Sequence, residues 1–159
     1  MNKNPILSVK TENRTEIKII NNKLEVINKD TIYEILRDIR DPEHPHTLEE
    51  LGVIKKEYIE IGEKQSTLIN DIKVKYIIIQ FHPTIPHCSM AAIIGLSIQL
   101  QMRNYIPVEY LVKVLIVPES HINWEALNKQ LNDKDRVMAA FENEALYDVI
   151  NSTLQEYNK

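Results

Sequence analysis

The most chemically informative stretch of the sequence is Pro83-Thr84-Ile85-Pro86-His87-Cys88-Ser89-Met90-Ala91, which contains the only cysteine of the chain. Its two prolines fix their own φ angles and disfavour helical backbone in the residues before them, so a helix is expected to begin at or after Pro86. Cys88 would then lie in the first turn, where unpaired N–H groups, the helix dipole and the neighbouring imidazole favour a thiolate. The alternative is a cysteine that acts as a small buried apolar residue.

Two histidines and two carboxylates could add metal chemistry to this thiol. Imidazole and carboxylate groups are ordinary zinc ligands, so His87 and His121 with Glu125 or Glu142 are a candidate zinc-type site. Their spacing matches no established zinc motif, and each side chain could equally be an ordinary surface or hydrogen-bonded group. His87 or His121 could also be the base of a thiol enzyme, although nothing in the sequence marks an oxyanion hole or substrate pocket.

A second dense stretch is the loop Asp41-Pro42-Glu43-His44-Pro45-His46, with two carboxylates, two prolines and two imidazoles. One interpretation is a rigid connection whose carboxylates cap turns and stay in solvent. The other is a stiff edge that docks a partner, because a rigid loop loses little entropy on binding. The basic residues after Trp124 allow the same two interpretations. The candidate partner-binding residues are Asp41, Pro42, Glu43, His44, Pro45, Lys129 and Arg136.

Composition limits the classes of protein that need consideration. The chain has 159 residues, of which 43% are hydrophobic and 26% charged, as expected for one soluble domain with a real core. A net charge of -4 gives no electrostatic footprint for nucleic acid or for an anionic membrane. One cysteine excludes an internal disulfide framework, and no apolar run approaches the roughly 20 residues that span a bilayer. The expected location is therefore the cytoplasm, with the nucleus as a second compartment.

The N-terminal part of the chain is the least committed. Residues 1–29 are rich in lysine and asparagine and are expected to form a mobile extension, with a transient strand or a docking peptide as alternatives. The folded domain is expected to span residues 30–159. Its first helix is predicted to begin at Thr31, which has Glu34 three residues later in a capping-box pattern, and to end before Pro42. Thr47 and Glu50 repeat that pattern.

The rest of the chain alternates between strand and helix patterns. Runs of β-branched and aromatic residues predict strands over 56–61, 74–81 and 110–117, with a polar connection over 62–71. Helical spacing predicts helices over 88–104, 124–131, 137–141 and 146–154, with Asp133 or Asp135 as a cap. The predicted fold class is α+β, a small mixed β-sheet packed with helices.

Three motifs in this order resemble the cytosolic iron-sulfur assembly component 2 family. They are Asp41-Pro42-Glu43-His44-Pro45 with Thr47-Leu48-Glu49-Glu50-Leu51, the stretch from Pro83 to Ala91 with Ile94-Gly95-Leu96, and Asn128-Lys129-Gln130-Leu131 with Asp133-Lys134, Arg136-Val137 and Ala139-Ala140. The resemblance covers residues 31–157. It implies the iron-sulfur cluster assembly domain fold, and it matches Cys88 to the family's reactive cysteine.

The resemblance implies an adaptor rather than an enzyme. In that family the protein joins a β-propeller subunit to a helical-repeat subunit of a cytosolic targeting complex, which helps deliver clusters to apo-proteins of the cytosol and nucleus. The alternatives are a metallochaperone or maturation factor for one metalloenzyme, and a Cys-His thiol enzyme. The sequence is also compatible with a homodimer. The chain departs from the family at the long polar stretch 62–71 and at Pro118-Glu119-Ser120-His121, where the family has a glycine-containing approach.

Ligand chemistry limits what one thiol can hold. An iron-sulfur cluster normally takes four cysteine thiolates, with histidines in place of two in some proteins. Cys88 could therefore bind a transient cluster only with ligands from a second subunit, a partner or a small thiol. The candidate cofactors are therefore a transient iron-sulfur cluster and a zinc ion, and the sequence indicates no other.

Overall fold

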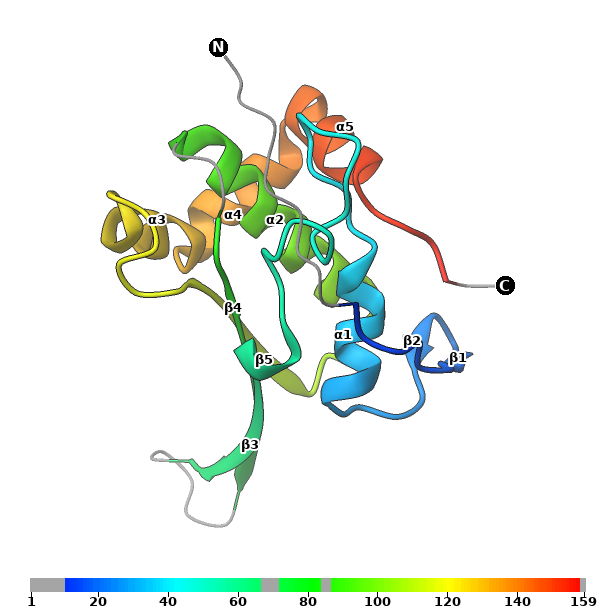
Figure 1. Ribbon diagram of the computed structural model, residues 1–159. Helices are drawn as coiled ribbons and strands as arrows, with labels where there is room; N and C mark the ends of the chain where they lie inside the picture. The colour runs from blue at the N-terminus through cyan, green and yellow to red at the C-terminus, as the bar shows by residue number, and fades with distance from the viewer. Residues whose placement is uncertain (1–10, 67–71, 84–86, 158–159) are drawn as a thin grey trace.

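A three-stranded mixed sheet and a central helix organise the domain (Figure 1). The computed structural model describes residues 11–66, 72–83 and 87–157. The described strands are β1 (Ile19–Ile20), β2 (Lys23–Leu24), β3 (Ile59–Gln65), β4 (Lys73–Phe81) and β5 (Tyr110–Ile116). The described helices are α1 (Lys29–Arg37), a short 3-10 helix (Lys56–Tyr58), α2 (Cys88–Tyr105), α3 (Trp124–Leu131), α4 (Lys134–Glu142) and α5 (Glu144–Ser152). This arrangement confirms the predicted α+β class.

Strand β4 is the middle strand of the sheet. It pairs antiparallel with β3 and parallel with β5, with Ile77 opposite Ile61 on one side and Val112 on the other. Alternate β4 residues, among them Ile77 and Ile79, are buried, because successive side chains of a strand point to opposite faces. The parallel pairing requires a crossover, which α2 provides between β4 and β5.

Helix α2 lies at the centre of the molecule, where it contacts β5, α1, α3 and α5 (Figure 1). A Cβ atom added to Gly95 would lie 2.7 Å from a Leu131 methyl group and 3.3 Å from the Phe81 ring. Since real Cβ atoms do not approach other atoms so closely, glycine at this position lets α2 pack tightly against α3 and β4. The sheet and the C-terminal helices therefore share one core.

Helix α1 begins earlier than the sequence predicts. Its N-cap is Asn28, whose side-chain oxygen accepts the N–H of Thr31 at 2.9 Å, while Thr31 Oγ1 accepts the N–H of Asn28 at 3.0 Å. Thr31 is thus the third helical residue, and the expected Thr31–Glu34 capping box is wrong. Asparagine is a strong N-cap residue, and the Glu34 carboxylate bonds to arginines instead. The second capping pattern, between Thr47 and Glu50, is confirmed.

The other differences lie around β3. Residues 56–58 form the 3-10 helix, so the strand expected over 56–61 begins only at Ile59. It continues to Gln65, into the expected polar connection, because β4 is long enough to pair with it as far as Lys73. Residues 67–71 of that connection lie outside the described residues. Asp133 caps α4 as predicted, accepting the N–H groups of Asp135 and Arg136.

Residues 11–28 pack against the domain, which differs from the mobile extension expected over 1–29. Strands β1 and β2 form a hairpin whose two turn residues, Asn21 and Asn22, have φ angles of 52° and 66°. Asparagine tolerates this left-handed region better than most residues, which suits a two-residue hairpin turn. Leu24 of β2 is 3% exposed and belongs to the core. Residues 1–10 lie outside the described part of the chain. Among the described residues, no helix is both long and apolar enough to cross a membrane.

Candidate functional site

The sheet topology brings the segment that contains Cys88 and the segment that contains His121 to the same edge of the sheet. Because β4 and β5 are parallel neighbours, their carboxyl ends lie side by side. The chain that leaves β4 reaches Cys88 at the start of α2, and the chain that leaves β5 passes His121 and Asn123 before α3 begins. The Val117 N–H donates to the Phe81 carbonyl at 2.9 Å and extends this pairing past the strand end.

Cys88 is the first residue of α2, and its side chain is exposed. The sequence prediction of a helix that begins directly after the prolines is therefore confirmed, with His87 as the N-cap residue. The His87 side chain makes no capping hydrogen bond, and both His87 and Ser89 are exposed. The thiol is thus accessible to an incoming ligand, which a cysteine serving as a buried apolar residue would not be.

Asn123 is the residue that contacts the thiol. Its side-chain Nδ2 lies 2.9 Å from Cys88 Sγ and donates to the sulfur. The backbone N–H of Asn123 donates to Nδ1 of His121 at 3.0 Å, so this ring nitrogen acts as a hydrogen-bond acceptor. Asn123 therefore links the exposed sulfur of Cys88 to the buried imidazole of His121.

Sequence reasoning did not identify Asn123, because an asparagine directly before a helix is typical of an N-cap residue. Asn123 does occupy the N-cap position of α3, but its side chain makes no capping hydrogen bond. Ile122, which precedes Asn123 in the chain, is 90% exposed, an apolar side chain in solvent. The loop before them contains Glu119 with a φ of 65°, the left-handed region that glycine adopts most easily. Glu119 belongs to the stretch Pro118-Glu119-Ser120-His121 singled out in the sequence analysis.

The candidate zinc ligands are not assembled into a metal centre. His87 is exposed at the start of α2, His121 is buried in the loop, and Glu125 is exposed in the first turn of α3. Glu142 is exposed at the end of α4. In the part of the chain that the structure describes, no group of three or more His, Cys, Asp or Glu side chains is placed to hold a metal ion.

The first residue of the acidic loop 41–46, Asp41, makes hydrogen bonds to the backbone of the loop itself. Asp41 is buried, and its Oδ1 accepts the N–H groups of Glu43 at 2.8 Å and of His44 at 3.1 Å. Its own N–H donates to the His46 carbonyl at 2.9 Å. Asp41 therefore shapes the loop and offers no exposed surface, whereas Glu43 and Pro45 are exposed. Pro42 and His44 are half-buried.

The two basic candidates lie on neighbouring helices. Lys129 is exposed on α3, and Arg136 is exposed on α4, where its Nε lies 3.6 Å from Oδ2 of Asp133. An exposed pair of this kind contributes little to stability because solvent screens it. Both side chains are therefore available at the surface.

Comparisons with known proteins place these residues in context. The model of a family described as iron-sulfur cluster assembly protein matches residues 29–115. Protein AE7 of Arabidopsis thaliana is 39% identical over 157 residues, which cover 97% of this chain and 94% of that protein. The mouse protein named cytosolic iron-sulfur assembly component 2B is 44% identical over 123 residues, covering 77% and 70%. The Dictyostelium discoideum protein of the same name is 34% identical over 168 aligned positions, covering 98% of each chain.

Proposed function

The chain belongs to the iron-sulfur cluster assembly protein family, and we propose that it is an adaptor subunit of the cytosolic machinery that delivers clusters to apo-proteins. In this role it joins a β-propeller subunit to a helical-repeat subunit and serves clients of the cytosol and nucleus. The relatives named as cytosolic iron-sulfur assembly components support the assignment, because the similarity extends over most of each chain. The protein acts by binding and not by catalysis.

The observation that carries this proposal is the exposed Cys88 thiol at the start of α2, with the Asn123 amide donating to it. A thiolate is a soft ligand that suits iron, and the cluster here is cargo. One cysteine can supply one of the four ligands that a cluster normally takes. The remaining ligands must come from a partner, a second copy or a small thiol, which suits transfer better than storage.

The acidic loop supplies a surface for a protein partner. The hydrogen bonds of Asp41 hold the loop in one conformation, so little conformational entropy is lost when a partner docks on it. Glu43 and Pro45 are the exposed residues of this edge. Lys129 and Arg136, exposed on α3 and α4, are the second candidate surface. The two surfaces suit two different subunits.

The alternatives are less well supported by the geometry. A thiol enzyme needs a base beside its nucleophile. Among the described residues, the side chain that donates to Cys88 Sγ is the amide of Asn123, which does not take up a proton at neutral pH. A maturation factor for one metalloenzyme would share the family fold. It differs from the adaptor in its clients, since its loss would affect one enzyme and not several.

The test is purification of the native protein with its stoichiometric partners, together with depletion in cells. We expect a β-propeller subunit and a helical-repeat subunit to copurify. We also expect several cytosolic and nuclear iron-sulfur enzymes to lose activity on depletion, while mitochondrial ones keep theirs. A protein recovered only in free form, from cells in which those enzymes stay fully active after depletion, contradicts the adaptor function. Loss of a single client enzyme favours the maturation factor.

A further inference from the structure

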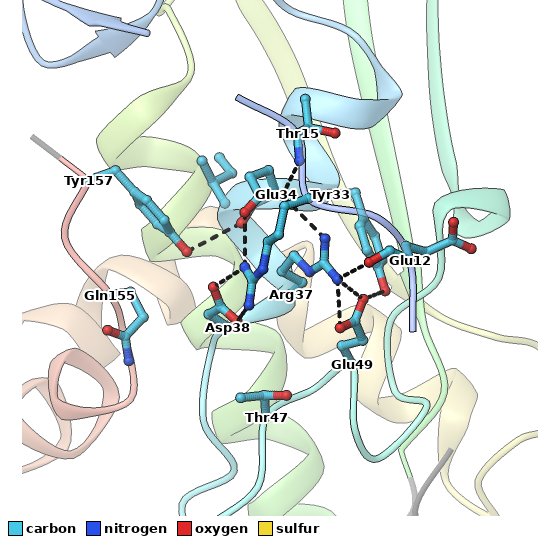
Figure 2. Close-up of polar contacts among 12 residues, drawn as sticks. Glu12, Thr15, Tyr33, Glu34, Arg37, Asp38, Thr47, Glu49, Gln155 and Tyr157 are labelled. Carbon is cyan, nitrogen blue, oxygen red and sulfur yellow. Dashed lines mark hydrogen bonds and ion pairs between the residues drawn. The ribbon is translucent and has the colours of Figure 1, made fainter. Parts of the chain in front are cut away.

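A cluster of charged side chains, most of them buried, lies on α1 and in the turn that follows the acidic loop. Arg37 of α1 has only 1% of its side chain exposed. Its guanidinium contacts Oε1 of Glu34 at 3.2 Å and Oε2 of Glu49 at 2.7 Å. The Tyr33 hydroxyl donates to Glu49 as well, at 2.6 Å (Figure 2).

The other half of the Arg37 hydrogen bonds goes to the backbone of the N-terminal segment. Nη2 donates to the Glu12 carbonyl at 2.6 Å, and Nη1 donates to the Asn13 carbonyl at 3.0 Å (Figure 2). These two acceptors belong to consecutive residues that lie about 25 positions before Arg37 in the sequence. Removing the acceptors of a charged donor lowers the stability of the protein much more when the donor is buried than when it is exposed.

Four further hydrogen bonds, three from Arg14 and one from Thr15, hold this segment. Arg14 donates from Nη1 to Glu34 at 2.9 Å and to Asp38 at 2.6 Å, and from Nη2 to Asp38 at 3.0 Å. The Thr15 N–H donates to Oε1 of Glu34 at 2.9 Å. Of residues 12–15, three thus contribute backbone groups and Arg14 contributes its side chain, while the Glu12 carboxylate lies 3.8 Å from Nζ of Lys56.

Charge balance explains why that side chain is an arginine. Glu34, Asp38 and Glu49 carry three negative charges against the single positive charge of Arg37, which leaves an excess of two before the segment binds. Arg14 neutralises one of them, with a planar guanidinium that meets the Asp38 carboxylate through two parallel N–H groups. The site is therefore complementary to an extended backbone with one cationic, fork-shaped side chain.

We propose that Glu34, Arg37, Asp38 and Glu49 form a recognition site for an extended, arginine-bearing peptide, and that residues 12–15 of this chain occupy it in cis. We call it the Arg37 site. It recognises two backbone carbonyls, one backbone N–H and one arginine, and the neighbouring Lys56 pairs with the Glu12 carboxylate at 3.8 Å. The arginine is the side chain that the four residues of the Arg37 site bind directly. A partner segment with an arginine in the third of four extended residues fits the same contacts. The inference goes beyond the proposed function and does not depend on it.

The first experiment uses the full-length chain and a labelled synthetic peptide of residues 11–17, Thr-Glu-Asn-Arg-Thr-Glu-Ile. The double variant Arg14→Ala/Thr15→Pro removes the side-chain cation and the N–H donor, so its own segment no longer fills the site. Fluorescence anisotropy should show that the peptide binds this variant at least tenfold more tightly than the wild type. The same peptide with alanine in place of arginine should bind the variant at least tenfold more weakly. A Lys18→Ala chain, which loses an exposed charge outside the site, should behave like the wild type.

The second experiment follows hydrogen exchange in the full-length chain and decides the matter even where the double variant does not fold. Arg14 is 61% exposed, so the single change Arg14→Ala leaves the core packing alone. It should accelerate exchange of the Thr15 amide at least tenfold while the amides of β4 keep their protection. Equal peptide binding by wild type and double variant, or unchanged exchange at Thr15, overturns the proposal. A concentration-dependent dimer that alone protects Thr15 overturns occupation in cis.

Discussion

Asn123 donates its side-chain amide to Cys88 Sγ across 2.9 Å, although Asn123 occupies the N-cap position of α3. The N-cap residues Asn28 and Asn143 use the same side chain to accept an N–H from the first turn of their helices. Asn123 has a φ of -107° and a ψ of 28°, outside the extended region that capping requires. Helix α3 therefore forgoes its cap, and the amide is available to the thiol.

Because Asn123 does not cap its helix and Asn143 does, the same Asn→Ala substitution should have different effects on stability at these two positions. Asn143→Ala removes a working cap of α5 and should cost about 1 kcal/mol of unfolding free energy. Asn123→Ala removes an asparagine that caps nothing and should change that free energy by less than half as much. Chemical denaturation of both variants measures the difference. Equal losses would show that Asn123 supports α3 in some other way.

The same Asn123→Ala variant should also change the chemistry of the cysteine. A donor to sulfur stabilises negative charge on it, so we expect iodoacetamide to alkylate Cys88 several-fold more slowly at neutral pH in the variant. Mass spectrometry of the intact protein follows the rate, because Cys88 is the single cysteine of the chain. Asn143→Ala is the matched control and should react like the wild type.

Replacement of Cys88 by serine separates packing from sulfur chemistry. Serine is similar in size and is well suited to the start of a helix, but it lacks the soft sulfur that iron prefers. Because Cys88 is exposed, Cys88→Ser should keep the melting temperature within a degree or two and should still bind the two subunits of the proposed complex. Client enzymes should stay inactive in depleted cells that express it. Full rescue of those enzymes would return Cys88 to a structural role.

Much of the fold follows from local patterns in the sequence. The β-branched runs identify β4 and β5, and the prolines before His87 identify the start of α2. These elements are also what brings Cys88 to His121, since parallel neighbours end at one edge. The cysteine half of the site was therefore predictable. The Asn123 contact was not, because the sequence pattern for an N-cap residue is the same whether or not its side chain caps the helix.

The Arg37 site could not be predicted either, for a different physical reason. Arginine and glutamate three residues apart on a helix are typical of a solvated face, and their burial depends on a segment some 20 residues earlier in the chain. Three of residues 12–15 contribute backbone groups to these contacts, and every sequence has such groups. For the same reason the composition of residues 1–29 suggested mobility, although Leu24 belongs to the core.

The packing of the N-terminal hairpin predicts that alanine substitutions at Leu24 of β2 and at Val26, two residues later, lower the unfolding free energy by different amounts. Leu24→Ala removes a buried side chain and should lower the unfolding free energy by about 2 to 3 kcal/mol. Val26→Ala changes a side chain that is 54% exposed and should cost less than 1 kcal/mol. Urea denaturation distinguishes the two. If both changes are neutral, residues 11–28 do not stabilise the domain in solution, and the boundary lies near residue 30.

The left-handed backbone at Glu119 predicts a stabilising substitution. Its φ of 65° costs an L-residue about 1 kcal/mol relative to glycine, which adopts this region freely. Glycine is more flexible in the unfolded chain, so the net gain for Glu119→Gly should be a few tenths of a kcal/mol. Glu119→Ala keeps the strain while it removes the carboxylate and is the control for charge. A glycine variant that melts no higher than the alanine variant would contradict the strain.

The hydrogen bond from Tyr33 to Glu49 predicts how stability changes at high pH. Burial, and next the bond to Glu49, raise the pKa of Tyr33 above its ordinary value near 10. The folded protein therefore keeps the phenolic proton at pH values where the unfolded chain loses it. The resulting stability is complete below about pH 10 and is lost as the pH rises through the folded pKa.

Tyr33→Phe removes this contribution and leaves the Glu49 carboxylate without its phenol donor. The variant should be less stable than the wild type at pH 8 by about 1 to 2 kcal/mol, a typical value for a hydrogen bond to a charged group. That difference should shrink steadily above pH 10. The pKa of Tyr157 is also raised, chiefly by burial, but this side chain is present in both proteins, so its titration cancels from the comparison. Unfolding free energies measured between pH 8 and 11 test the prediction, and a difference that stays constant across that range would mean that the phenol bond is unrelated to the titration.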